Sequence, residues 1–166
     1  GRAPKGCIKR RSAAKVGDII AVTGKLGASS KGLVDIMFGD MDTPAARHHR
    51  IAQARIVEGE WLGRRKEVGA MMDISDGIAS DIKHIMELSK VGAEIELKAI
   101  PTDYDIRYAT TGGEDYELLL TVAKEEFESE EGKAILKKLG IEGNYEGIGN
   151  LILGYAEKPA AAAAPR

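Results

Sequence analysis

The chain is organised around residues 71 to 82, which read Met71-Met72-Asp73-Ile74-Ser75-Asp76-Gly77-Ile78-Ala79-Ser80-Asp81-Ile82. Apolar residues run into Asp73, and Gly77 then opens a different pattern. Isoleucines recur at positions 78, 82 and 85, which is the i, i+4, i+7 spacing of one helix face. The stretch therefore predicts a strand that turns directly into an α-helix.

Two carboxylates, Asp73 and Asp76, stand three residues apart at this turn. Such a pair can point into one cavity, and Mg²⁺ binds carboxylate oxygens together with substrate phosphates. The start of a helix also favours a bound anion. The structural alternative is that Ser75 or Asp76 caps the helix while Asp73 is only solvated. The spacing by itself leaves both interpretations open.

Composition excludes several classes of protein. The chain has 166 residues, a formal net charge of −2 and 30% charged residues, which favours one domain with neither a nucleic acid nor a membrane as partner. Its one cysteine, Cys7, excludes an internal disulfide and suits a reducing compartment. No apolar run approaches the length of about 18 residues that spans a bilayer, and no signal peptide opens the chain. We expect a cytoplasmic protein.

The N-terminal region combines positive charge with a glycine-rich turn. One arginine of Arg10-Arg11-Ser12 could clamp a phosphate, although a solvated basic end explains the same residues. A strand is predicted over Asp18 to Thr23, and residues 24–32, GKLGASSKG, follow it. This is not a P-loop, because no Gly-Lys-Ser/Thr stands at the required spacing. Its backbone amides could still face an anion, and close backbone packing is the alternative.

A second dense stretch covers Thr110 to Val122. Two glycines precede the acids at 114, 115 and 117, and the strand pattern of Leu118 to Val122 follows. Charges beside a core strand are unfavourable unless they are paired or bind something. We expect the glycines to let the backbone turn so that Glu114 faces a pocket.

The remaining elements follow from periodicity and turn residues. Helices are predicted over Arg47 to Leu62 and over Ile78 to Ser89. His48 and His49 are adjacent and face different directions on a helix, which argues against a shared metal site and favours a solvated role. Strands are predicted over Asp18 to Thr23, Ala93 to Leu97, Glu117 to Val122 and a piece within Ile148 to Leu153.

These motifs resemble those of one enzyme family. Asp73-Ile74-Ser75-Asp76-Gly77, Gly112-Gly113-Glu114-Asp115-Tyr116-Glu117-Leu118 and Arg11-Ser12-Ala13-Ala14-Lys15-Val16-Gly17-Asp18 are similar to motifs of thiamine-monophosphate kinase, in the same order. The resemblance runs from about Arg11 to Gly154, and the Gly-Gly-Glu-Asp run is specific to this kinase. The wider superfamily includes aminoimidazole ribonucleotide synthetase and selenophosphate synthetase.

The resemblance implies a fold and an activity. The fold would be α+β, a three-layer α/β/α arrangement with a mixed sheet and helices on both faces, like the C-terminal domain of aminoimidazole ribonucleotide synthetase. The reaction would transfer the γ-phosphoryl group of ATP to thiamine monophosphate, with Mg²⁺. Asp73 and Asp76 would bind Mg²⁺, Arg11 and Ser75 would contact ATP, and Glu114 would contact the thiamine substrate. No residue is assigned as catalytic, because the acceptor is itself a phosphate.

The resemblance also implies that more protein is needed. Residues 1–154 would be the C-terminal domain of a two-domain kinase whose N-terminal domain is absent, and residues 155–166 a low-complexity tail. A homodimer would form through the missing domain, and the isolated chain would be an incomplete catalyst. Tyr104 to Ala109 is shorter than in the family, and the family's C-terminal aromatic has no match. Two alternatives remain, another ATP-using enzyme of the superfamily and a stand-alone nucleotide-binding module.

Overall fold

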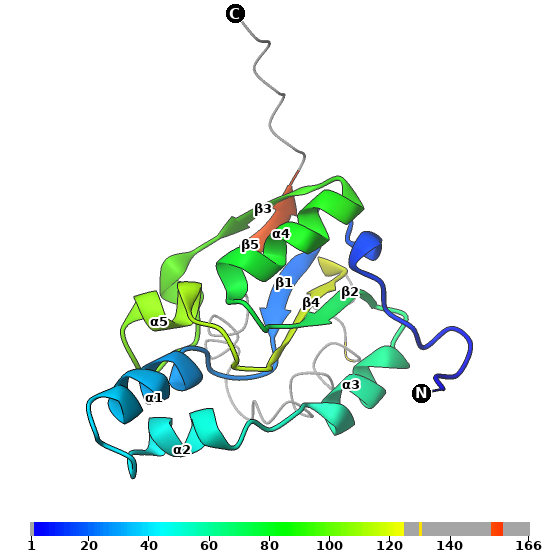
Figure 1. Cartoon of the computed structure of the whole chain (residues 1–166). Coiled ribbons are helices and arrows are strands. Elements are labelled where there is room, and N and C mark those ends of the chain that lie inside the picture. Colours follow the sequence, from blue (N-terminus) through cyan, green and yellow to red (C-terminus); the bar gives the residue numbers. More distant parts are fainter. Residues whose placement is uncertain (1, 125–129, 131–153, 158–166) are drawn as a thin grey trace, which may run out of the picture.

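A five-stranded sheet forms the centre of the molecule (Figure 1). The computed structural model describes residues 2–124, 130 and 154–157. The strand order is β2-β4-β1-β5-β3, with bounds β1 Ile19–Val22, β2 Val68–Asp73, β3 Gly92–Ile95, β4 Leu118–Val122 and β5 Gly154–Glu157. The helices are α1 Ala28–Met37, α2 Pro44–Arg50, α3 Ile56–Gly63, α4 Ile78–Ser89 and α5 Ile106–Thr111, with 3-10 turns η1 Arg11–Ala13 and η2 Leu97–Ala99.

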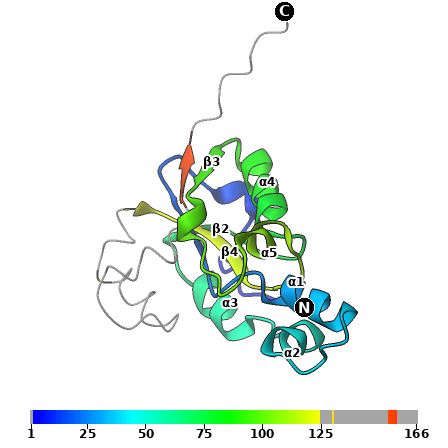
Figure 2. The same ribbon diagram turned by 90° about the vertical axis from the view of Figure 1, so that its left-hand side faces the viewer.

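Strand β1 shows how the two faces of the sheet are filled. Ile20 and Val22 join the isoleucines of α4 in one apolar cluster, whereas Ile19 and Ala21 join Leu62 of α3 in another. Successive side chains of a strand point to opposite faces, so the two clusters lie on opposite sides of the sheet. Figure 2 shows α4 and α5 on the same side. The predicted α+β fold with helices on both faces is confirmed.

The strand directions differ from the expected mixed sheet. Every neighbouring pair among the described strands is antiparallel: β2 with β4, β4 with β1, β1 with β5, and β5 with β3. The mixed sheet was an implication of the resemblance. An apolar strand carries no local signal for the direction of its neighbours, so the residues themselves could not have indicated this arrangement.

Helix α4 has the bounds predicted for it, Ile78–Ser89, and buries its isoleucines. Its start differs from the prediction. Gly77 is the N-cap residue and no side chain caps the helix, so the expectation that Ser75 or Asp76 does so was wrong. The free amides of Ser75 and Asp76 instead donate to the carboxylate of Asp81, at 2.9 and 3.0 Å.

The helix predicted over Arg47 to Leu62 is two helices, α2 and α3, separated by residues 51–55. Of the apolar residues that suggested one continuous face, Ile51 is 70% and Val57 71% exposed, whereas Trp61 packs against the apolar cluster around Leu62. Thr43 caps α2 and Pro44 lies in its first turn, so this helix begins three residues before the predicted start. Arg55, the N-cap residue of α3, donates to the distant Glu117, and α3 begins after it.

Strands β1, β3 and β4 lie where they were predicted, within two residues at their ends. The strand predicted within Ile148 to Leu153 falls outside the described residues, as does most of the tail. Strand β5 lies between β1 and β3, so the sheet extends to Glu157 and the boundary at residue 154 was set too early. Helix α5, Ile106–Thr111, begins within Tyr104 to Ala109, the segment expected to be shorter than in the family. No helix in the described part of the chain is long and apolar enough to cross a membrane.

Candidate functional site

The two motif stretches lie side by side, joined through their backbones. Beyond the last β2–β4 pair, Asp73 opposite Leu118, the amide of Ile74 donates to the Glu117 carbonyl at 2.8 Å. The amide of Glu114 then donates to the Ser75 carbonyl, also at 2.8 Å. These bonds extend the ladder of the two strands into the turn, so the position of Glu114 is fixed relative to the Asp-Ile-Ser-Asp turn.

Both glycines of the second stretch are required by close neighbours. A Cβ on Gly113 would lie 2.5 Å from the Ser75 carbonyl oxygen, so a side chain there would force the two motif loops apart. A Cβ on Gly112 would lie 2.3 Å from the Tyr108 carbonyl oxygen and from Ser30 Cβ, so a side chain there would displace α5 or α1. Glu114 itself has φ 65°, in the left-handed region that few residues other than glycine adopt. Such strain persists only where the surroundings impose it, which is common at binding sites.

The acids of the second stretch have different roles. Asp115 is buried and accepts the amides of Gly27 at 2.7 Å and Ser29 at 3.1 Å, so it satisfies the start of α1. Burial raises the pKa of the Asp115 carboxyl, and the two amides oppose that rise. Glu117 is also buried, and it accepts hydrogen bonds from Arg55 Nε at 2.7 Å and Thr23 Oγ1 at 2.6 Å. The burial of Asp115 and Glu117 is therefore explained by their hydrogen bonds within the fold.

Glu114 is the exception, because its carboxylate is exposed and lines a cavity of about 420 Å³. We call this the Glu114 cavity. Its other lining residues come from α1, α2 and the two motif loops: Ser29, Ser30, Leu33, His49, Ser75, Asp76 and Gly113. The expectation that the glycines let Glu114 face a pocket is confirmed by this placement.

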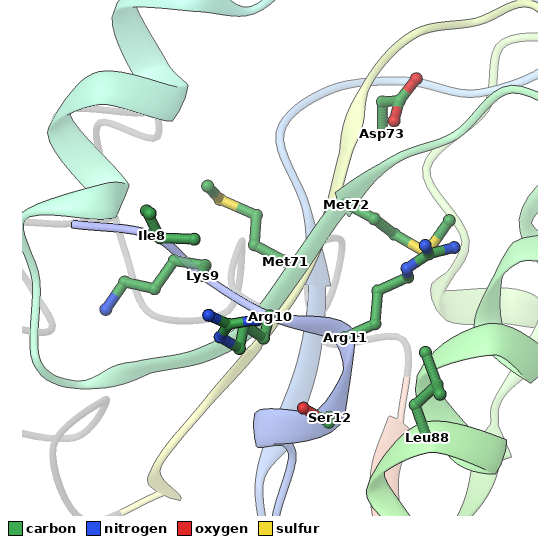
Figure 3. A pocket seen from close by; sticks show the side chains of 9 residues that line it. All are labelled: Ile8, Lys9, Arg10, Arg11, Ser12, Met71, Met72, Asp73 and Leu88. Carbon is green, nitrogen blue, oxygen red and sulfur yellow. The ribbon is translucent and has the colours of Figure 1, made fainter. Parts of the chain in front are cut away.

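A second cavity, of about 550 Å³, lies along β2 and η1 (Figure 3). We call it the Arg11 cavity; it is lined by Ile8, Lys9, Arg10, Arg11, Ser12, Met71, Met72, Asp73 and Leu88. The Arg11 side chain extends beside Met72, whereas Lys9 extends the other way (Figure 3). Ser89 of α4 donates its hydroxyl to the Arg11 carbonyl at 2.6 Å, which fixes η1 against the helix.

Lys9 does not offer a free charge to this cavity. Its Nζ donates to the Val68 carbonyl at 2.9 Å and to the Arg65 carbonyl, and burial lowers its pKa. The side chain of Arg11 has no hydrogen bond or ion pair within the described part of the chain. An exposed guanidinium without a partner, on a backbone that is fixed, suits an anionic group such as a phosphate.

The structure divides the predicted site residues between the two cavities. Arg11 and Asp73 line the Arg11 cavity, while Ser75, Asp76 and Glu114 line the Glu114 cavity. The two residues proposed for ATP therefore do not share one cavity, and neither do the two aspartates. The Asp-Ile-Ser-Asp turn forms the wall between the cavities.

Asp73 and Asp76 fit Mg²⁺ in part. Both carboxylates are exposed, and neither is engaged by another side chain or amide among the residues that the structure describes. Hard oxygen donors of this kind suit Mg²⁺, which keeps several waters and substrate oxygens as ligands. No group of three or more His, Cys, Asp or Glu side chains that could hold a metal ion occurs in the described ranges. Phosphate oxygens would have to complete the coordination.

Two residues near the site were missed by sequence reasoning. Asp81 is 1% exposed and supports the turn from inside, and His49 lines the Glu114 cavity although a solvated role was favoured for it. A signal for Asp81 was present: it stands between Ile78 and Ile82 near the buried helix face, where a charge needs partners. His49 had no such signal, because its surroundings come from distant segments.

Comparison with known proteins identifies relatives. The family model described as AIR synthase related protein, C-terminal domain, matches residues 15–154. A thiamine-monophosphate kinase of Haemophilus influenzae is 36% identical over 146 residues, which cover 79% of this chain and 43% of that protein. The chain thus spans less than half the length of this curated relative.

Two solved structures are also similar to this chain. The crystal structure of thiamine-monophosphate kinase from Stenotrophomonas maltophilia has a TM-score of 0.76 and covers 94% of this chain and 52% of its own, at 23% identity, and so supports the fold alone. AaThiL complexed with AMPPCP and TMP has a TM-score of 0.69 at 27% identity, with the same coverage of both chains.

Proposed function

Because the chain belongs to the family described as AIR synthase related protein, C-terminal domain, we propose that the full-length protein transfers the γ-phosphoryl group of ATP to thiamine monophosphate. The product would be thiamine diphosphate. The proposal is supported by the kinase relatives and by AaThiL, which was solved with AMPPCP and TMP. AMPPCP is an analogue of ATP, so that complex corresponds to a kinase with both reactants bound.

One observation in this chain carries the proposal. The Asp-Ile-Ser-Asp turn and the Gly-Gly-Glu run are joined by backbone hydrogen bonds, and the turn separates a cavity with an unpaired guanidinium from one with an exposed carboxylate. A reaction between ATP and a cationic phosphate ester needs two such neighbouring environments. Positioning of the two reactants is the main task of the protein in phosphoryl transfer.

We assign roles on this basis. Arg11 and Ser75 would contact the phosphates of ATP, and Asp73 and Asp76 would hold Mg²⁺, which when bound neutralises charge between the two anionic reactants. Glu114 would face the thiazolium or aminopyrimidine of the acceptor, because a carboxylate pairs with a cation and accepts from an amine. The acceptor phosphate is already ionised, so no side chain is needed to remove a proton from it.

The wider setting is part of the proposal. This chain would supply the C-terminal domain of a two-domain cytoplasmic enzyme, and the other domain would provide further metal ligands and a homodimer interface. The kinase relative supports this, because the matched region covers only 43% of the length of that protein.

The assignment of Glu114 is tested by Glu114→Gln in the full-length protein. We predict that thiamine monophosphate binds about tenfold more weakly while ATP affinity changes less than twofold, because glutamine keeps the size and removes the charge. Calorimetric titration with each reactant measures both dissociation constants. Asp103→Asn, an exposed acid outside both cavities, is the control. A loss confined to ATP, or no binding of thiamine monophosphate by the wild type, would contradict the proposal.

A further inference from the structure

His49 is the one side chain of the described residues that engages the Glu114 carboxylate. It lies at the end of α2, and its Nδ1 is 2.8 Å from Ser29 Oγ and 3.7 Å from Glu114 Oε2. The imidazole is mostly enclosed, at 18% exposure, whereas the Glu114 side chain is 59% exposed. Ser29 is fully buried in the first turn of α1, so the ring is held by a fixed partner.

The backbone of Glu114 is fixed, but its side chain is not. The amide is bound to Ser75 and φ is 65°, which leaves the carboxylate free to turn about its side-chain torsions. A long exposed side chain samples several rotamers unless a neighbour selects one. Among the described residues, the contact with His49 is the interaction that can select one rotamer of the Glu114 side chain.

The proton arrangement of His49 follows from its two neighbours. Ser29 Oγ can donate or accept, whereas an ionised carboxylate only accepts. With the ring proton on Nδ1, His49 donates to Ser29 and presents positive charge to Glu114. With the proton on Nε2, a nitrogen lone pair would face the carboxylate at 3.7 Å. The carboxylate therefore favours the Nδ1–H tautomer.

We propose that His49 is a positioning residue for Glu114: its Nδ1–H donates to Ser29, and the positive end of the same N–H dipole attracts the Glu114 carboxylate at 3.7 Å and holds it at the Glu114 cavity. A carboxylate held in one place recognises a cationic ring at a smaller entropic cost than one that must be ordered on binding. The identity of the ligand, thiamine monophosphate, rests on the proposed function. The coupling between His49 and Glu114 rests on the geometry of this chain alone.

The competing explanation is that His49 only joins α2 to α1 through Ser29. In that case its loss would lower stability and affect both reactants alike. Three variants of the full-length protein distinguish the two roles: His49→Leu removes the donor, His49→Asn restores an amide N–H close to the place of Nδ1, and His84→Leu makes the same change on the exposed side of α4.

Calorimetry with thiamine monophosphate and with ATP gives the first readout. We expect His49→Leu to weaken thiamine monophosphate binding about twofold to fivefold, the range of a partly exposed charge contact, with ATP changed less than twofold. His49→Asn should recover most of the loss, and His84→Leu should match the wild type. In a Glu114→Gln background His49→Leu should have no further effect, because a positioning residue acts through its partner. An undiminished effect in that background would overturn the proposal.

A second readout does not depend on the reaction. Two-bond ¹H–¹⁵N spectra of the full-length protein report which ring nitrogen of His49 carries the proton. We expect the Nδ1–H form in the wild type and a shift toward Nε2–H in Glu114→Gln. If the wild type does not bind thiamine monophosphate, the proposed function fails and these spectra alone decide the inference. An Nε2–H ring in the wild type would overturn it.

Discussion

Asp81 supports the turn between β2 and α4 from inside the core. It is almost fully buried, and one carboxylate oxygen accepts the amides of both Ser75 and Asp76. These amides would otherwise be unpaired donors in the turn before the helix. The position of the two exposed aspartates therefore depends on an acid that contacts neither cavity.

We predict that Asp81→Ala lowers the free energy of unfolding by about 2–3 kcal/mol, because it leaves two amides without an acceptor. Asp81→Asn should lose about half as much, since its side-chain oxygen can still accept. Urea denaturation of the full-length protein measures both. Asp40→Asn, at an exposed loop position, is the control and should stay within about 0.5 kcal/mol of the wild type. Equal stability of Asp81→Ala and this control would show that the turn does not depend on Asp81.

Individual residues were predictable where the chain itself supplied the reason. Glu114 follows two glycines and precedes a core strand, and both features are local. Asp115 and Glu117 appeared alike in the sequence, yet their partners, the amides of α1 and the side chain of Arg55, lie about 60 to 90 positions away. No spacing rule reveals such partners, which is also why His49 was missed.

At the scale of elements, the ion pair of Arg55 and Glu117 sets where α3 begins. Arg55 is the N-cap residue of α3 and donates from Nε to the buried carboxylate of Glu117 on the edge of β4. The hydrogen bond with Glu117 raises the pKa of Arg55. The pair thus connects the break between α2 and α3 to the core strand.

We predict that Arg55→Met lowers the free energy of unfolding by about 2–3 kcal/mol, because it leaves a buried carboxylate with only the Thr23 hydroxyl as partner. The double variant Arg55→Met with Glu117→Gln should lose less than the sum of the two single changes. Arg107→Met breaks a comparable but exposed pair with Asp105, and should cost less than about 1 kcal/mol. Denaturant titration compares the three, and equal losses for Arg55→Met and Arg107→Met would contradict a structural role for the buried pair.

Elements were predictable in proportion to how much of their pattern is local. Helix α4 has three buried isoleucines at helical spacing, and its bounds were predicted correctly. The apolar residues of the segment from 47 to 62 also recur at helical spacing, but Ile51 and Val57 face solvent, so the pattern was misleading. Thr43 and Pro44 form a helix start signal, whereas the apolar periodicity placed the predicted start at Arg47.

At the scale of the whole molecule, the sheet brings distant segments together. Strand β5, from residues 154–157, lies between β1 and β3, so the last described segment joins these two strands into one sheet. The order and the antiparallel directions could not be derived from the strands themselves, because the residues of a strand do not indicate which strand lies beside it. The family resemblance supplied the layers, and it was wrong about the strand directions.

The two cavities divide the two aspartates that we propose for Mg²⁺. Asp73 lines the Arg11 cavity and Asp76 lines the Glu114 cavity, and no group of three or more possible metal ligands occurs among the described residues. In the proposed reaction, phosphate oxygens and waters would complete the coordination of Mg²⁺ at this turn. The central claim is therefore that this turn acts in ATP-dependent phosphorylation of thiamine monophosphate by the full-length protein.

The most direct test is the rate of thiamine diphosphate formation from ATP, Mg²⁺ and thiamine monophosphate by the full-length wild type, Asp73→Asn, Asp76→Asn and the exposed control Asp40→Asn. We predict turnover by the wild type and Asp40→Asn, and a loss of roughly a hundredfold or more in the other two, the range expected when a charged contact to the reacting phosphates is removed. Melting temperatures of all four should agree within a few degrees. Near-normal turnover of Asp73→Asn and Asp76→Asn across a Mg²⁺ titration, or no thiamine diphosphate from the wild type, would contradict the claim.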